Sequence, residues 1–196
     1  MKLEKALLLL LIIVISSCST DKKPNESVPK EEQIQIKSLK KVNDLILTET
    51  TLGKLKLEKG IPIKESTIKE LFSGFPVLKK LGEQDDPNFF YYDIGSGIQL
   101  KTQNLENETL SQVWISEKSN ASDEYGIKLG MAYSDIEKSR PNMNISTEHH
   151  HIYLYAEDSN IAYEMSLGNY NGPDKEQYSL KDIKNYNSKV ASIIWK

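Results

Sequence analysis

The sequence predicts an α+β domain built mostly from antiparallel β-strands, sandwich-like in its architecture, with two or three short helices. Many short runs of apolar, β-branched and aromatic residues follow one another along the chain. Turn signals rich in glycine, asparagine and aspartate separate these runs. Few segments carry apolar residues at helical spacing. Short strands in succession with few helices favour antiparallel pairing over a parallel sheet.

The expected strands are recognised by alternating or continuous apolar residues. Two hairpin turns are expected between them, at residues 93–97 and 157–160. The last strand contains Ile193-Ile194-Trp195, a run typical of a buried strand. The expected strands are residues 51–57, 89–94, 98–102, 110–116, 125–129, 152–156, 161–167 and 189–196.

Helical spacing predicts short helices at three places. One lies within residues 39–46, a second follows Ser66 and ends before Gly74, and a third spans residues 135–139 after Ser134. Both serines are expected to act as helix N-caps. A strand, a glycine and a capped helix thus occur twice, which leaves open that the domain consists of two diverged halves. Two copies are fewer than repeat architectures usually contain.

The N-terminus predicts export and lipid attachment. Residues 6–15 are an unbroken apolar run, shorter than the roughly 20 residues that span a bilayer, and they match the hydrophobic region of a secretory signal. The run ends in Ile15-Ser16-Ser17-Cys18, which resembles the bacterial lipobox. Residues 1–17 are therefore expected to be a signal peptide, with cleavage before Cys18 and acylation of its thiol. Two acyl chains suffice for stable anchoring.

The mature chain is expected to have a tether and one globular domain. Residues 18–33 contain the lipidated cysteine and a polar, proline-containing stretch without an apolar cluster, which indicates disorder. Residues 34–196 are expected to form the single domain. The formal net charge is −3 and no basic block is present, so nucleic-acid binding is not expected. Cys18 is the only cysteine, which excludes a disulfide within one chain.

The chain from about Leu52 to Lys196, most clearly beyond Tyr125, resembles the RpoE-regulated (sigma-E-regulated) lipoproteins of enteric bacteria, a domain family of unknown function. The matching motifs are Gly168-Asn169-Tyr170-Asn171-Gly172-Pro173 and Lys189-Val190-Ala191-Ser192-Ile193-Ile194-Trp195, with further matches near Gly126 and Tyr133 and a weaker one near Gly53. This chain lacks the cysteine pair of the enteric members. The resemblance implies a periplasm-facing, β-rich domain on an outer-membrane anchor and implies no catalytic residues. Ser19, directly after the cysteine, favours outer-membrane sorting in a host with two membranes.

His149, His150 and His151 are the candidate metal ligands. On a strand, His149 and His151 would point the same way and form half of a zinc site, with Asp93 or Glu157 as a third ligand. The alternative is that the histidines simply open the strand at 152–156. The acidic residues Glu83, Asp85 and Asp86 lack the order of a calcium loop. Gly95-Ser96-Gly97 is too short for a nucleophile elbow and does not match a phosphate-binding loop.

Aromatic residues are the candidate binding surface. Alternation places Tyr153 and Tyr155 on one face of a strand, and Tyr163, Tyr170 and residues 89–92 add further rings. If that face is open, it would suit a protein or a glycan; otherwise the rings pack in the core.

The function expected from the sequence is that of a non-enzymatic, membrane-anchored envelope lipoprotein without a cofactor, with a structural or binding role in outer-membrane maintenance. Two alternatives stay open. One is a tethered inhibitor or assembly factor that binds another envelope protein. The other is a metal-dependent hydrolase that uses His149 and His151.

Overall fold

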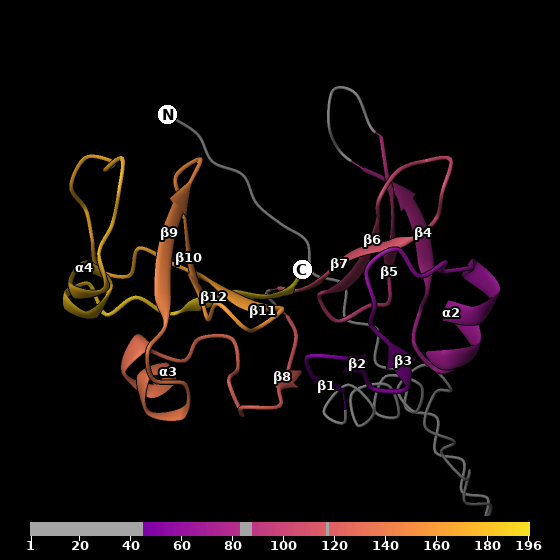
Figure 1. Cartoon of the computed structure of the whole chain (residues 1–196), viewed down its shortest axis with the longest axis horizontal. Coiled ribbons are helices and arrows are strands. Elements are labelled where there is room, and N and C mark those ends of the chain that lie inside the picture. The colour runs from indigo at the N-terminus through magenta and orange to yellow at the C-terminus, as the bar shows by residue number, and fades with distance from the viewer. Residues whose placement is uncertain (1–44, 83–87, 117) are drawn as a thin grey trace, which may run out of the picture.

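The chain forms two β-sheets and three short helices, seen in a computed structural model that describes residues 45–82, 88–116 and 118–196 (Figure 1). Eight strands form the larger sheet, in the order β4-β5-β6-β7-β12-β11-β10-β9, and all its neighbours are antiparallel. The smaller sheet has the order β3-β2-β1-β8, with β1 and β8 parallel. The elements are β1 (Ile46–Leu47), β2 (Thr51–Leu52), β3 (Leu55–Lys56), α2 (Glu65–Leu71), β4 (Leu78–Leu81), β5 (Phe90–Asp93), β6 (Ile98–Thr102), β7 (Leu110–Ile115), β8 (Ser122–Asp123), α3 (Tyr133–Ser139), β9 (Asn144–Glu148), β10 (His151–Tyr155), β11 (Ile161–Met165), α4 (Leu180–Asn185) and β12 (Val190–Trp195).

The large sheet consists of two modules with the same order of elements. In the first module α2 precedes the four strands β4 to β7, and in the second α3 precedes β9 to β12. The last strands of the two modules, β7 and β12, pair antiparallel at the centre of the sheet. From this junction the strands of each module follow in reverse chain order toward the edges, which are β4 and β9. The second module also holds α4 between β11 and β12. This topology agrees with the two diverged halves that the sequence left open.

One face of the large sheet packs against the core. Alternate residues of β6 (Ile98, Leu100 and Thr102) are buried there, as the period of a strand requires. In Figure 1 the small sheet lies below the middle of the large sheet, α2 lies beside the first module, and α3 and α4 lie beside the second. Buried side chains from both sheets and all three helices form one hydrophobic cluster. None of the helices in the described part of the chain is long and apolar enough to cross a membrane.

The predicted fold class is confirmed, and so is most of the strand prediction. Strand 98–102 has its predicted bounds, and five further strands begin and end within two residues of them. Residues 51–57, predicted as one strand, instead form the β2–β3 hairpin, because Gly53 adopts a left-handed conformation (φ +56°) that turns the chain. Residues 125–129 form no strand. The Asp123 carboxylate accepts hydrogen bonds from the main-chain N–H groups of Tyr125 and Ile127 and holds a turn there.

The predicted serine caps are wrong. The N-cap residues are Lys64 for α2 and Ala132 for α3, and neither helix has a side-chain cap. Tertiary pairing fixes both helix starts instead: Ile63 N–H donates to Glu108 O before α2, and Tyr133 N–H donates to Ser188 O at the start of α3. The helix expected within residues 39–46 falls largely outside the described residues, and Ile46 begins β1. The strands β1, β4, β8 and β9 and the helix α4 were not predicted.

Candidate functional site

The three histidines do not share a strand. His149 and His150 form the turn between β9 and β10, both with positive φ (48° and 69°), and only His151 belongs to β10. The expected pairing of His149 and His151 on one face is therefore wrong, because a left-handed two-residue turn interrupts the strand period. The described ranges hold no cluster of three or more histidine, cysteine, aspartate or glutamate residues able to hold a metal.

The proposed third ligands are engaged elsewhere or lie apart. Asp93 pairs with Lys80 at 3.0 Å and accepts a hydrogen bond from Gly95 N–H at 2.9 Å. Glu157 is exposed in the turn between β10 and β11, at the opposite end of that hairpin from His151. The acidic residues Glu83, Asp85 and Asp86, as well as Cys18, lie outside the described residues.

His151 instead belongs to a short chain of polar contacts. Its Nδ1 lies 2.5 Å from Glu164 Oε1, and Ser192 Oγ donates to Glu164 Oε2 at 2.8 Å. Glutamate is the middle member, so histidine does not contact the serine hydroxyl. Nucleophilic catalysis needs a base in contact with the nucleophile and a third group that orients the base. This order of residues holds the glutamate in place and does not form such a triad.

The tyrosines divide between the core and the opposite face of the large sheet, which we call the outer face. Tyr153 and Tyr155 lie on the outer face, as alternation predicted, and each is half-buried. Tyr92 and Tyr163 are fully buried in the core. Tyr170 lies in the loop between β11 and α4, where its ring packs against Tyr178 and Tyr186. Tyr153 and Tyr155 thus lie outside the core, whereas Tyr92 and Tyr163 pack within it.

The middle of the outer face is formed jointly by the two modules. Across the β7–β12 junction, Trp114 pairs with Ile194, which pairs with Ala162, which in turn pairs with Tyr155. A second row of cross-strand neighbours, beside the first, contains Ser192, Glu164 and Tyr153. On the side of the first module, Lys101 of β6 pairs with Gln112 of β7. Aromatic rings, amides and charges of both signs therefore lie next to one another here.

Lys101 is the most unusual charge on the outer face. Its Nζ lies 4.2 Å from the centre of the Trp114 ring, within the range of a cation–π interaction. Burial lowers the pKa of Lys101 from its ordinary value, and the Glu164 carboxylate partly opposes this. Glu164 is three strands away, on β11, so charges of the two modules act on each other across the junction. Burial, followed by the charges of Glu164 and Glu148, raises the pKa of Tyr153.

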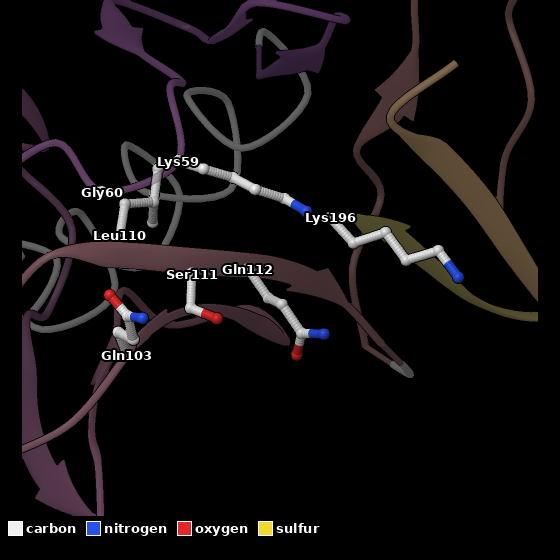
Figure 2. A pocket seen from close by; sticks show the side chains of 7 residues that line it. All are labelled: Lys59, Gly60, Gln103, Leu110, Ser111, Gln112 and Lys196. Carbon is white, nitrogen blue, oxygen red and sulfur yellow. The ribbon is translucent and has the colours of Figure 1, made fainter. Parts of the chain in front are cut away.

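A pocket of about 360 Å³ adjoins this area (Figure 2). Its lining residues come from the turn before α2, the end of the β6–β7 hairpin and the end of β12: Lys59, Gly60, Gln103, Leu110, Ser111, Gln112 and Lys196. Sequence reasoning found Tyr153 and Tyr155 but missed Lys101, Gln112 and Trp114. The alternation of buried Val113 and Ile115 around Trp114 was the available signal for that residue.

A buried polar network lies on the other side of the large sheet. The Tyr163 hydroxyl donates to the Asp123 carboxylate and accepts a hydrogen bond from Arg140 Nη1 at 2.9 Å. Arg140, the only arginine in the chain, also stacks on the Tyr125 ring at 4.0 Å. Burial raises the pKa of Asp123, although hydrogen bonds from Tyr163 and the main chain act in the opposite direction. The network joins β8, α3 and β11 and is structural.

Comparison with known proteins supports the fold. No protein-family model matches the sequence, and no curated protein matches it. Among solved structures, the fold is similar to that of the uncharacterized protein YfeY from Escherichia coli, with a TM-score of 0.58 and 20% sequence identity. The match covers 77% of this chain and 99% of that chain. At this identity the similarity concerns the fold alone.

Proposed function

We propose that this protein is a non-enzymatic, lipid-anchored envelope protein that binds another envelope component through the middle of its outer face. The anchor rests on the apolar run before Cys18 and on the uniqueness of that cysteine. The binding role rests on one observation: two modules bring Lys101, Trp114, Tyr153 and Glu164 together across their junction. A cation, an acid and aromatic rings in one area suit recognition of a partner surface.

Family and location belong to the same proposal. The C-terminal motifs, from Gly168 to Pro173 and from Lys189 to Trp195, support membership of the RpoE-regulated lipoproteins. The fold shared with a protein of Escherichia coli is consistent with that membership. With Ser19 behind the lipidated cysteine, we place the protein in the outer membrane, with its domain facing the periplasm.

The mixed aromatic and charged outer face supports a binding role over structural support alone. With a protein as the partner, the chain acts as a tethered inhibitor or assembly factor, and Tyr153 and Tyr155 contribute rigid contact area on the outer face. The order Ser192–Glu164–His151 gives no support to hydrolysis by a serine nucleophile. The turn conformation of His149 and His150 gives none to hydrolysis by a zinc-bound water.

Site-specific photo-crosslinking in cells tests the binding face. A photoreactive phenylalanine is placed at Trp114 or Tyr155 on the outer face, and at Glu70 on the exposed side of α2 as the control. We expect a discrete crosslinked species from the two outer-face positions and none from Glu70. The substitution Lys101→Glu should abolish that species, whereas Lys181→Glu on α4 should not. Identical products from all three positions, or none from the outer face, would contradict the proposal.

A further inference from the structure

The pocket beside the outer face is shaped by a β-bulge in β7. Lys101 pairs with Gln112 and Thr102 pairs with Leu110, so Ser111 is an extra residue between two pairs. A bulge of this kind redirects side chains, and here both Ser111 and Gln112 line the pocket. Figure 2 shows Gln103, Ser111 and Gln112 projecting together from the β6–β7 hairpin and Lys59 extending toward Lys196. The bulge thus places consecutive polar side chains in one cavity.

The amide groups of the pocket present hydrogen-bond donors. Gln112 Oε1 accepts a hydrogen bond from the Trp114 indole N–H at 3.1 Å. Because an indole nitrogen only donates, this contact fixes the amide orientation and leaves the Gln112 amino group to donate. Gln103 is oriented in the same sense, since its Oε1 accepts from the Thr109 hydroxyl at 3.3 Å. Within the described residues, neither glutamine amino group makes a hydrogen bond.

The charges around the pocket are positive. Lys59 and Lys196 line it, and none of its seven lining residues has an acidic side chain. The Lys196 ammonium group points away from the other lining residues (Figure 2) and lies 5.8 Å from the centre of the Tyr153 ring, so Lys59 supplies the charge of the lining itself. The turn that carries Lys59 is held against β7 by a hydrogen bond from Gly60 N–H to Leu110 O at 2.9 Å. Lys101, the direct register partner of Gln112, adds a second ammonium group near the lining, 4.2 Å from the centre of the Trp114 ring. Its partial burial, which lowers its pKa, means that a nearby anion would stabilise its charged form.

We propose that this pocket binds a phosphate group, as a monoester or diester, of an envelope ligand. The donors are two amide amino groups, one hydroxyl and the ammonium groups of Lys59 and Lys101. A phosphate monoester presents three charged oxygens to them in a tetrahedral arrangement, and a diester presents two charged and two ester oxygens, whereas a carboxylate has only two oxygens in one plane. The volume of about 360 Å³ leaves room for the group that carries the phosphate. This inference rests on the proposed function, because it names the class of ligand that binds beside the outer face. Its test, however, requires no partner protein.

The test is phosphate binding to the purified, lipidated protein in a non-ionic detergent. The ³¹P NMR signal of inorganic phosphate, and separately that of glycerophosphoglycerol, is titrated with protein at constant ionic strength. We expect saturable broadening or shift with at least one of these probes. Binding of the diester alone would identify a lipid or polymer headgroup as the source, and binding of inorganic phosphate would identify a free or terminal phosphate. Acetate, followed by ¹³C NMR, should bind at least about tenfold more weakly.

Gln112→Glu is the decisive variant. It keeps the acceptor for the Trp114 indole but replaces the donating amino group by an oxygen of a carboxylate, so phosphate affinity should fall by about tenfold or more. Gln99→Glu is the matched control, because Gln99 pairs with Trp114 on the same face but does not line the pocket. It should change affinity by less than about twofold, and circular dichroism checks that both variants fold. The inference is overturned if neither probe saturates, if acetate binds equally well, or if both variants weaken binding to the same degree. Loss of crosslinking from Trp114 with phosphate binding intact would contradict the proposed function alone.

Discussion

Removal of the Tyr163 hydroxyl tests how strongly the buried network holds the second module together. Tyr163→Phe keeps the ring but deletes the group that donates to Asp123 and accepts from Arg140. Asp123 keeps its two main-chain donors, at 2.8 and 3.0 Å. Arg140 keeps a contact of 3.4 Å to Ile161 O, an ion pair of 3.9 Å with Glu49 and its aromatic stacking.

Two hydrogen bonds to charged, buried partners are lost in this variant. Each is worth about 1.5–3 kcal/mol, and the retained contacts recover part of the loss, so we expect a destabilisation of about 2–4 kcal/mol. Tyr163 is fully buried and Asp123 is 2% exposed, so water cannot replace the hydroxyl without a rearrangement. Urea unfolding followed by tryptophan fluorescence measures the free energy of unfolding, provided that the dependence on urea is unchanged.

Tyr153→Phe is the matched control for this measurement. Tyr153 lies on the outer face of neighbouring β10, and its hydroxyl makes no hydrogen bond to another described residue. Its removal should change the free energy of unfolding by less than about 0.5 kcal/mol. A loss below about 1 kcal/mol for Tyr163→Phe, or equal losses for both variants, would refute the reasoning that the network stabilises the fold.

Three further predictions concern single groups. The pKa of Asp123 is higher in the folded state than its ordinary 3.8, so as the pH falls the folded state takes up this proton before the unfolded state does. The free energy of unfolding of the wild type, relative to that of Asp123→Asn, should therefore rise as the pH falls from 7 toward 4. Urea unfolding of both proteins at each pH measures this difference, and a difference that stays constant or falls would contradict the prediction. Gly168→Ala should destabilise the protein by more than about 1 kcal/mol, because the residue has φ +57° and its new Cβ would lie 2.2 Å from Tyr186 O; an unchanged thermal midpoint would count against this. Hydrogen bonds from Ser179, then from Lys175, hold the pKa of Asp182 well below its usual range. The pKa of Asp182, measured by ¹³C NMR titration, should therefore rise more in Ser179→Ala than in Lys175→Met. The reverse order would be inconsistent with the geometry.

The fold class was predictable because most strands in this chain have a regular pattern of burial. Strand 98–102 alternates without interruption, and the sequence predicts its bounds as the structure has them. The unpredicted β9 is an edge strand whose residues are nearly all half-buried, so it carries no apolar alternation. The leucines at 52, 55 and 57 suggested one strand. Because the chain turns at Gly53, Leu52 is instead buried as part of β2, Leu55 as part of β3, and Leu57 in the segment that follows β3.

The candidate site was only partly predictable, for a different reason. Alternation along β10 is local and identified Tyr153 and Tyr155. Lys101, Trp114 and Glu164 come from three strands of two modules, and only the pairing of β7 with β12 brings them together. The bulge at Ser111 also shifts the register, so counting along the sequence does not show that Ser111 and Gln112 line one pocket.

The central claim, that a lipid on Cys18 anchors this domain to a membrane, is tested most directly by mass spectrometry of the N-terminal peptide of protein purified from host membranes. The account predicts a mature chain that begins at Cys18 and carries a diacylglyceryl thioether. It also predicts that Cys18→Ser gives an uncleaved precursor without lipid. A wild-type chain with an unmodified Cys18 thiol, or one that begins at another residue, would contradict the account.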